Sequence, residues 1–531
     1  MSMNAQGRPT KSENGAANAM GADAKTFTGN RGLVIEESLI FEKDAFGRTG
    51  VDFPEPQGGA NRLGGRDRRD DIGLPGLSEP ETMRHFVRLS QKNYAIDMGP
   101  FPLGSCTMKH NPRLNEKVAR LPGFADVHPM QPEATVQGAL ELIHMLAFWL
   151  KELTGMPAVA MSPKAGAHGE LCGMMTIKAA IVARGEAAKR VRVLAPESAH
   201  GTNPATAAQC GFKVDAIPAD ATGRVDLTAL KEKLGEDVAG IMVTNPNTCG
   251  LFERDIREIA DAVHAAGGYF YCDGANFNAI AGKARPGDLG VDAMHINLHK
   301  TFSTPHGGGG PGSGPTVLSE ALAPFAPVPF IVEREGRFHL IERREAAKTA
   351  GAEGAESFGR MTAFHGQMGM FVRALSYMLS HGADGVARAA EDSVLNANYV
   401  LARLRSELTA SFEGYCMHEA LFDDRFLKGT GVETIDFAKA MIDEGYHPMT
   451  MYFPLVVRGA MLIEPTESES KAELDRFCDA LLSLARRAKA GDVAAFKAAP
   501  RHAPLRRLDE TGAARKPVLR WKPPQPAEAA E

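Results

Sequence analysis

The sequence predicts an α/β protein built on a mostly parallel, doubly wound β-sheet, with a smaller α+β domain toward the C-terminus. Short apolar runs alternate with helical patterns through the middle of the chain, and such alternation is typical of parallel sheets covered by helices. With 44% hydrophobic and 24% charged residues, the 531-residue chain has the composition of a globular protein. Its length predicts more than one domain, because single cores stop growing at about 250–300 residues.

The large domain is expected over residues 126–329. Apolar residues at helical spacing from Val136 to Leu150 predict its first helix, and Gly155 is placed to cap that helix. A second helix is expected over 256–266. Ligands of such sheets bind beyond the carboxyl ends of the strands, so the residues after each strand are the first candidates for a site. The expected strands are 191–195, 214–218, 239–244, 268–273 and 294–298.

Three further segments flank this domain. Residues 1–125 are expected to form an N-terminal arm and extended segment, because 1–30 have a disordered composition and 50–71 have no helical or strand periodicity. Helical patterns over 357–378, 391–408 and 477–490 place a smaller α+β domain at 330–498. Residues 499–531 form a Pro/Ala-rich basic tail, with seven basic and two acidic residues over 501–522.

Charge and cysteine usage exclude several classes of protein. Sixty Lys and Arg against 65 Asp and Glu give a net charge of −5, so we expect neither nucleic acid nor an anionic membrane as a partner. No run reaches the roughly 18 apolar residues that a membrane helix needs. The seven cysteines are scattered singly, which predicts a reducing compartment, the cytoplasm, and no disulfide or metal framework.

A turn of small residues precedes the expected helix 171–184. Gly166 and Ala167 lie in this turn, where backbone amides and the positive end of the helix dipole would suit a phosphate. By itself the pattern is weak, because a Gly/Ala turn before a helix is more often only a turn.

Two charged residues follow later strands. Asp273 ends the strand 268–273, and Lys300 lies 27 residues further on, about one β–α–β connection away. A helix N-cap or an ordinary salt bridge is the competing interpretation of Asp273. A phosphate turn, then an acid, then a lysine is the order used by pyridoxal phosphate (PLP) enzymes of the aspartate aminotransferase-like fold, fold type I. There the lysine forms the Schiff base and the acid pairs with the pyridinium nitrogen.

Polar residues after two other strands complete the candidate set. His200 and Thr202 follow the strand 191–195, where this fold places a residue against the cofactor ring; a core or loop histidine is the alternative. Asn245 follows the strand 239–244 and is a candidate cofactor contact, with turn chemistry as the alternative.

Longer motifs then give a specific resemblance. The chain resembles glycine dehydrogenase (decarboxylating), the P-protein family of the glycine cleavage system, and within it subunit 2 of the two-subunit prokaryotic form. The resemblance runs in order from about residue 90 to 480. The matching stretches are 98–110, 165–170, 198–204, 273–276, 299–301, 305–312, 464–469 and 471–479.

The resemblance implies a function and a site. The family decarboxylates glycine through a PLP aldimine and passes the aminomethyl group to the lipoyl arm of H-protein, releasing CO2. The implied partners are glycine, lipoylated H-protein and a separate subunit 1, with two copies of each subunit. The matching motifs imply that Lys300 is the Schiff-base lysine, Asp273 the pyridinium partner and His200 the ring-stacking residue. They also imply that three residues lie near the phosphate: Gly166, Ala167 and His299.

Some roles stay open at this point. The segment Ser105–Lys109 and the glycine-rich loop 306–310 are candidates for lining or gating a lipoyl channel, although Cys106 also fits as a small buried hydrophobic residue. Another PLP reaction on the same fold, such as transamination or aldol cleavage, is the alternative activity. A non-catalytic partner subunit is the third interpretation, and Lys300 in its surrounding motif argues against it.

Overall fold

The computed structural model divides into two compact units. One comprises Met1–Tyr94, Lys439–Gly445 and Val493–Glu531, and the other comprises Ala95–Ala438 and Tyr446–Asp492. The expected N-terminal arm 1–30 lies outside the described residues, as do most of 50–71 and the end of the basic tail. The structure describes residues 37–43, 48–50, 54, 57, 64–66, 74–128, 131–307, 310–351, 353–503 and 506–520.

The first unit is mainly helical. Its α1 (Glu79–Ser90) begins with a capping box in which Ser78 and Glu81 satisfy each other's backbone amides. On the same helix, buried His85 bonds Glu37 at 2.9 Å. The Asp443 carboxylate accepts the backbone N–H of Arg501 at 2.6 Å. The unit also holds η2 (Ile40–Lys43), α14 (Val493–Ala498), α15 (Glu510–Arg515) and the end of α12 (Thr434–Asp443).

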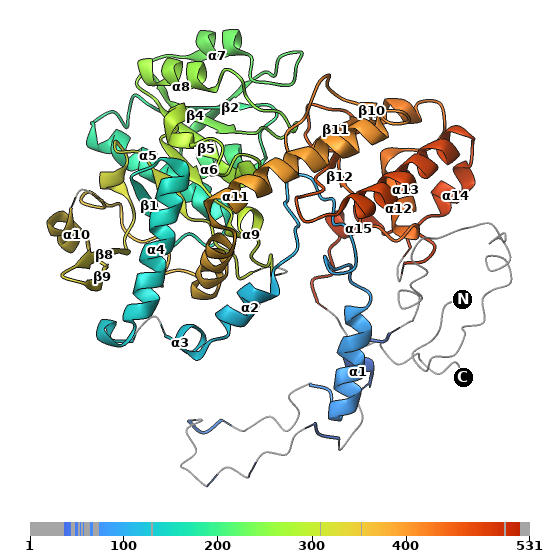
Figure 1. Ribbon diagram of the computed structural model, residues 1–531, viewed down its shortest axis with the longest axis horizontal. Helices are drawn as coiled ribbons and strands as arrows, with labels where there is room; N and C mark the ends of the chain where they lie inside the picture. The colour runs from blue at the N-terminus through green and yellow to red at the C-terminus, as the bar shows by residue number, and fades with distance from the viewer. Residues whose placement is uncertain are drawn as a thin grey trace. The chain divides into compact units, whose positions relative to one another are not determined.

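The second unit is organised around a seven-stranded sheet of order β1-β7-β6-β5-β4-β2-β3 (Figure 1). The five strands from β6 to β3 run parallel, whereas β7 pairs antiparallel with both β1 and β6. This confirms the mostly parallel α/β fold. The strands are β1 (Ala158–Ala160), β2 (Arg192–Pro196), β3 (Lys213–Ile217), β4 (Val238–Thr244), β5 (Tyr269–Asp273), β6 (Ala293–His295) and β7 (Thr316–Leu318).

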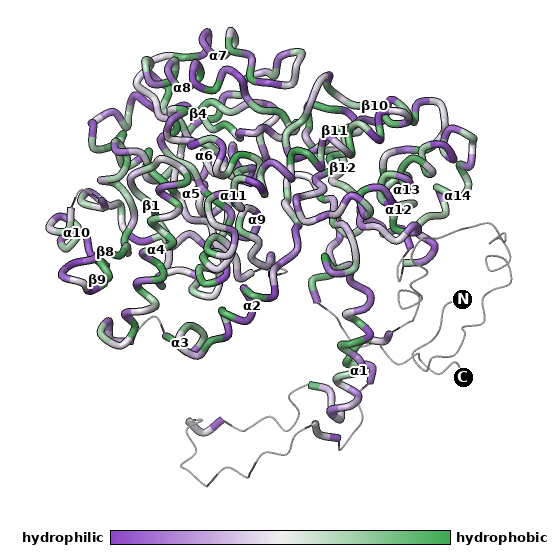
Figure 2. Tube along the Cα trace, viewed as in Figure 1, coloured by the Kyte–Doolittle hydropathy of each residue, from purple (hydrophilic) through white to green (hydrophobic). Residues whose placement is uncertain are grey.

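Helices cover both faces of this sheet, because its strands are apolar on both sides. In β4, Ile241 and Val243 face α4 (Gln137–Thr154), α7 (Leu227–Lys233) and α8 (Ile256–Ala265), whereas Met242 faces α5 (Gly166–Ala183) and α6 (Thr202–Gln209). Alternation of two along a strand produces this division. Figure 2 shows β4 as largely hydrophobic.

One predicted strand ends earlier than expected. The sequence pattern extended the last strand over 294–298, but β6 ends at His295, and Lys300 lies in the short helix α9 (Leu298–Thr301). Asn297 is the N-cap of this helix, and its carbonyl accepts the N–H of Lys300 at 3.0 Å. The apolar run therefore continues past the point where the chain leaves the sheet.

A four-stranded antiparallel sheet of order β10-β11-β13-β12 forms the smaller part of this unit. The helices expected over 357–378 and 391–408 correspond to a single helix, α11 (Met368–Leu404). This helix is broken at Gly382, where φ is +66°. The helix expected over 477–490 is α13 (Lys471–Lys489). Domain limits at 126, 330 and 499 stay predictions. The strands are β10 (Thr409–Ala410), β11 (Ala420–Asp423), β12 (Thr450–Met451) and β13 (Met461–Ile463).

The remaining elements of the second unit are short. β8 (Phe330–Arg334) and β9 (Arg337–Ile341) form a separate hairpin. Within the described residues, no helix is long and apolar enough to cross a membrane. The other elements are α2 (Arg113–Ala119), η3 (Glu133–Thr135), α3 (Pro122–Ala125), η4 (Gly274–Ala279), η5 (Pro286–Leu289), η6 (Ala323–Phe325), α10 (Arg344–Ala350) and η7 (Asp424–Leu427).

The segment before α2 joins the two sheets of this unit. Leu103 forms an isolated bridge with Ile463 of β13. Further along, the buried ammonium of Lys109 forms an ion pair with Glu467 and donates to Asn278 Oδ1 at 2.9 Å and to the Thr301 carbonyl at 2.8 Å. The segment is therefore held at one end by the smaller sheet and at the other by the turn that carries Lys300.

Replacing Lys109 with Met is expected to lower the free energy of unfolding by about 3–5 kcal/mol, because the Glu467 carboxylate, whose side chain is only 12% exposed, would lose its cation. Denaturant titration of the full chain measures this change. Lys471→Met is the control, since its ion pair with Asp475 is exposed and is worth about 1 kcal/mol or less. Equal losses in both variants would contradict the role given to Lys109.

Candidate active site

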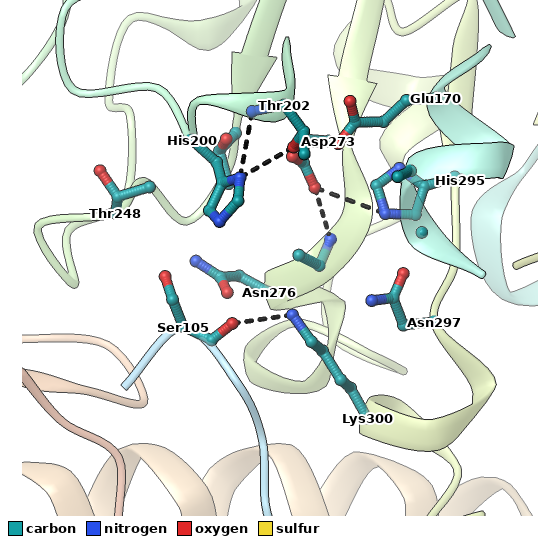
Figure 3. A pocket seen from close by; sticks show the side chains of 14 residues that line it. Ser105, Glu170, His200, Thr202, Thr248, Asp273, Asn276, His295, Asn297 and Lys300 are labelled. Atoms are coloured by element: carbon teal, nitrogen blue, oxygen red, sulfur yellow. Dashed lines mark hydrogen bonds and ion pairs between the residues drawn. The ribbon is translucent and has the colours of Figure 1, made fainter. Parts of the chain in front are cut away.

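A cavity of about 210 Å³ opens at the carboxyl ends of the central strands (Figure 3). Six of the predicted site residues line it. They come from the ends of strands and from the first turns of α5, α6 and α9, as expected for a parallel sheet. These residues are Gly166, Ala167, His200, Thr202, Asp273 and Lys300.

Asp273 is the buried carboxylate of the cavity. Its Oδ1 accepts the N–H of Ala275 at 2.9 Å, and its Oδ2 accepts from Asn203 Nδ2 at 3.0 Å. Burial acts to raise the pKa of Asp273, but His295, the Asn203 and Ala275 hydrogen bonds and the charge of Lys300 outweigh it, so the pKa lies below its ordinary value. Asp273 therefore stays ionised. It is also the N-cap of η4, which is the competing interpretation of the sequence, and its pairing with a pyridinium nitrogen stays a prediction.

His295 and Tyr271 continue this network behind Asp273. His295 Nε2 lies 3.5 Å from Asp273 Oδ1, and its Nδ1 lies 2.6 Å from the Tyr271 hydroxyl. Burial lowers the pKa of His295 despite the nearby carboxylate. The imidazole therefore lies between a phenol, to which it is hydrogen-bonded, and the Asp273 carboxylate, which it contacts electrostatically.

Glu170 brings a second carboxyl group to the same place. It lies on α5 and is buried, with the hydroxyls of Thr202 and Thr206 at 3.0 and 3.1 Å from its oxygens. Burial first, and then the charge of Asp273, raise the pKa of Glu170 to about 8. The pair therefore carries one negative charge at neutral pH, located on Asp273.

Lys300 lies opposite Asp273 across the cavity. Its Nζ donates to the carbonyl of Ser105 at 2.8 Å, as Figure 3 shows. Ser105 belongs to the segment that the sequence marked as a channel candidate, and the structure places it in the cavity wall. The lysine is buried, so its amine is shielded from bulk water.

The N-terminus of α5 forms a cradle for an anion. A Cβ on Gly166 would lie 2.7 Å from Asn297 Oδ1, so only glycine leaves this space open. The first backbone amides of α5 have no partner within the helix. Beside Gly166, Asn297 Oδ1 is buried and, within the described part of the chain, has no hydrogen-bond partner. These features fit the phosphate of PLP.

His200 and Thr202 lie side by side at the start of α6. The Thr202 hydroxyl is 2.8 Å from His200 Nδ1, and the His200 ring meets Phe453 edge-on at 5.5 Å between centroids. The imidazole is exposed and lines the cavity, as a residue that stacks on a bound ring would. The stacking role itself stays a prediction.

Two predicted site residues do not line the cavity. His299 is buried against His306, and burial lowers its pKa to about 3. The side chain of Asn245 accepts the N–H of Glu253 at 3.0 Å, which is the turn chemistry that the sequence left as the alternative. The His306 imidazole lies 3.1 Å from the Thr107 carbonyl, while residues 308 and 309 of the proposed gating loop lie outside the described residues.

Sequence reasoning missed Glu170 and His295 as site residues, although both stand in motifs that it singled out. Strand register could have found His295. Because Cys272 pairs with Met294, the next pair along β5 and β6 is Asp273 with His295. No comparable sequence pattern marked Glu170, because Thr202, to which it is hydrogen-bonded, lies on a different helix.

The fold and the site define a class of protein. An aminotransferase class-V family model matches residues 178–321, and a model described as glycine dehydrogenase, C-terminal domain, matches residues 389–507. Among solved structures, a glycine decarboxylase (P-protein) in inhibitor-bound form superposes with a TM-score of 0.64 at 20% identity, over 82% of this chain and 91% of that chain. The fold is that of the PLP-dependent enzymes of fold type I, as predicted.

Curated relatives identify the family more closely. A probable glycine dehydrogenase (decarboxylating) subunit 2 of Caulobacter vibrioides is 67% identical over 98% of this chain and 98% of the relative. The protein of the same name from Exiguobacterium sibiricum is 50% identical over 92% of this chain and 98% of the relative. The chain belongs to the glycine dehydrogenase (decarboxylating) subunit 2 family, which confirms the predicted resemblance.

A further solved structure shares the fold. An Oryza sativa protein, TDC, solved with PLP and tryptamine, superposes with a TM-score of 0.61 at 12% identity, over 77% of this chain and 88% of that chain. At this identity the likeness concerns the fold alone.

Glu170 is expected to make stability fall with pH. Because its pKa is about 8 in the folded chain against an ordinary 4.5, the folded state binds more protons than the unfolded state between these values. The free energy of unfolding should therefore decrease as pH rises through this window. Glu170→Gln should flatten the decrease, as measured by denaturant titrations at several pH values. Parallel curves for both proteins would refute the assignment of the proton to Glu170.

Proposed function

We propose that this chain is the PLP-bearing subunit of a glycine cleavage enzyme, which decarboxylates glycine and passes the aminomethyl group to the lipoyl arm of H-protein with release of CO2. One observation carries the proposal: Lys300, Asp273 and the α5 N-terminus converge on one buried cavity. Family membership supports the choice of reaction, since the curated relatives are named glycine dehydrogenase (decarboxylating) subunit 2.

Each part of the cavity has a role toward PLP. Lys300 would hold the aldehyde carbon, Asp273 the ring nitrogen, and the cradle at Gly166 and Ala167 the phosphate, with His200 against the ring face. When bound, PLP supplies the electron sink that makes loss of the glycine carboxylate feasible. His299 and Asn245 remain proposed contacts of the cofactor's surroundings.

The protein's own residues set the protonation of the site. Asp273, kept ionised by its hydrogen bonds and by His295, holds a proton at the ring nitrogen. Glu170 retains its own proton, so a single negative charge faces that nitrogen. The buried walls exclude water that would otherwise protonate the reacting carbon.

Partner proteins and cytoplasmic location are parts of the same proposal. The name "subunit 2" carried by the relatives supports a separate subunit 1. The assembly that we propose has two copies of each subunit. On α4, Met145, Phe148 and Trp149 are exposed at positions that share one helical face, which is typical of a protein interface. All seven cysteines are unpaired, as expected in a reducing compartment.

Lys300→Ala is expected to abolish the visible absorbance that PLP acquires when it binds the chain, because Lys300 is the only lysine among the described residues that line the cavity. Borohydride should fix the cofactor to the wild-type chain and not to this variant. Lys283→Ala, which removes an exposed lysine paired with Glu391, is the control and should behave as the wild type.

Exchange of the glycine carboxyl group with bicarbonate tests the reaction itself. We expect exchange only when lipoylated H-protein and subunit 1 are both present. Exchange without H-protein would instead favour another PLP reaction, and a chain that never binds PLP through Lys300 would leave a non-catalytic subunit as the better description.

Trp149→Glu is expected to weaken association with subunit 1 at least tenfold, since it places a charge in an apolar contact face. Sedimentation of the mixed subunits measures the association. Val182→Glu, an exposed apolar residue of α5, serves as the control. Unchanged association of the Trp149 variant would remove α4 from the interface.

A further inference from the structure

Behind Lys300 lies a buried glutamate that the mechanism above does not use. Glu419 immediately precedes β11 and is fully buried. Its Oε2 accepts the backbone N–H of Ser105 at 2.7 Å, and its Oε1 lies 3.4 Å from Asn276 Nδ2. Ser105 and Asn276 both line the cavity, so a residue of the smaller sheet holds two parts of its wall.

Ser105 has a backbone conformation that needs support. Its φ is +61°, in the left-handed region that side-chain-bearing residues rarely adopt and that costs about 1–2 kcal/mol. In this conformation the backbone N–H and the carbonyl of Ser105 bond to different partners. Its N–H points to Glu419, and its carbonyl accepts from Lys300 Nζ at 2.8 Å. Ser105 therefore links Glu419 to Lys300 through hydrogen bonds to both side chains.

The groups around Glu419 favour its neutral form. Because Ala420 pairs with Ile463, the next pair along these strands is Glu419 with Glu464. Burial, and then the charge of Glu464, raise the pKa of Glu419 well above its ordinary value. Lys300 opposes this increase, while the adjacent His418 is held neutral by burial, with a pKa of about 3. Glu464 itself accepts from Thr107 and has a pKa raised by burial to about 7.

A metal ion is a poorer explanation of this cluster. His418, Glu419 and Glu464 bring their ligand atoms within 4.8 Å of one another. However, both oxygens of Glu419 and one oxygen of Glu464 already face protein donors, and Lys300 adds a positive charge nearby. The geometry points instead to support of the wall beside the lysine.

We propose that Glu419 is a positioning residue that holds the Ser105 carbonyl in place as the acceptor for Lys300 Nζ whenever the lysine is not joined to the cofactor. The proposal rests on the proposed function of Lys300. Held at this carbonyl, the amine stays in the cavity, oriented for the aldehyde. Its condensation with PLP would form a C=N bond between Nζ and the aldehyde carbon, and the aldehyde oxygen would leave as water together with the two protons of the neutral amine. A misplacement of about 1 Å can slow such a step about a hundredfold.

Two substitutions separate the reach of Glu419 from its carboxyl chemistry. Glu419→Gln keeps an acceptor oxygen at the same distance and replaces the carboxyl group by a neutral amide, whereas Glu419→Asp keeps a carboxyl group and falls short of Ser105 by one methylene. We expect the rate at which the cofactor-free chain acquires the PLP absorbance to stay within about threefold for Gln and to fall at least tenfold for Asp. The reverse order, or equal rates in both variants, would overturn the proposal.

Ser105→Gly provides a rescue that a purely structural role would not show. Glycine adopts positive φ without cost and keeps the carbonyl, so adding it to Glu419→Asp should restore most of the rate. Glu253→Asp is the matched control. Glu253 is likewise buried, accepts the N–H of Val225 at 3.2 Å and an Asn247 amide at 2.7 Å, and does not line the cavity. A loss in this control equal to that of Glu419→Asp, or no rescue by glycine, would contradict the proposal.

Hydrogen exchange separates this proposal from the proposed function. Mass spectrometry of the cofactor-free full chain should show slow exchange over residues 103–107 in the wild type and Glu419→Gln, and faster exchange in Glu419→Asp. If the wild type failed to bind PLP through Lys300, the proposed function would be wrong. The order of exchange rates among the three proteins would still test the contact between Glu419 and Ser105. Equal exchange in all three proteins would overturn the contact.

Discussion

The site depends on one buried charge, the carboxylate of Asp273 at the end of β5. An ionised carboxylate in this position is stable only where hydrogen bonds and positive charge replace the water it has lost. Asn203 and the Ala275 amide supply those bonds, while His295 and Lys300 stabilise the charge electrostatically. Because Glu170 is protonated, it adds no second negative charge beside Asp273. Asn203, His295 and Lys300 come from different elements, so the fold has to bring these elements together.

Close packing of α5 on the sheet makes this arrangement possible. A Cβ on Gly169 would lie 2.6 Å from the His295 Cβ, and one on Gly173 would lie 2.6 Å from the Tyr271 ring. These glycines let the helix approach the side chains that lie behind Asp273. The sequence indicated that small residues near the helix start would admit an anion, and for Gly166 this stays a prediction. At Gly169 and Gly173, the small residue serves contact between helix and strand instead.

The sequence predicted the architecture and much of the cavity, because alternation of strands and helices places the residues after each strand at one edge. Gly166, Ala167, His200, Thr202, Asp273 and Lys300 were found in this way. Contacts between distant segments were beyond such reasoning: Ser105 lies 195 positions before Lys300 and Glu419 lies 314 positions after Ser105. The end of β6 was misplaced, since hydrophobicity continues into α9 while pairing stops at His295. Cofactor contacts of His299 and Asn245 stay predictions.

The protonation state of the cofactor's ring nitrogen tests most directly the role given to Asp273. It can be measured by nitrogen NMR of the full chain loaded with PLP that carries 15N in the ring. We expect the nitrogen to be protonated in the wild type at neutral pH and to lose this proton in Asp273→Asn, with PLP still attached to Lys300. An unprotonated ring nitrogen in the wild type would contradict the central role of the Asp273 carboxylate.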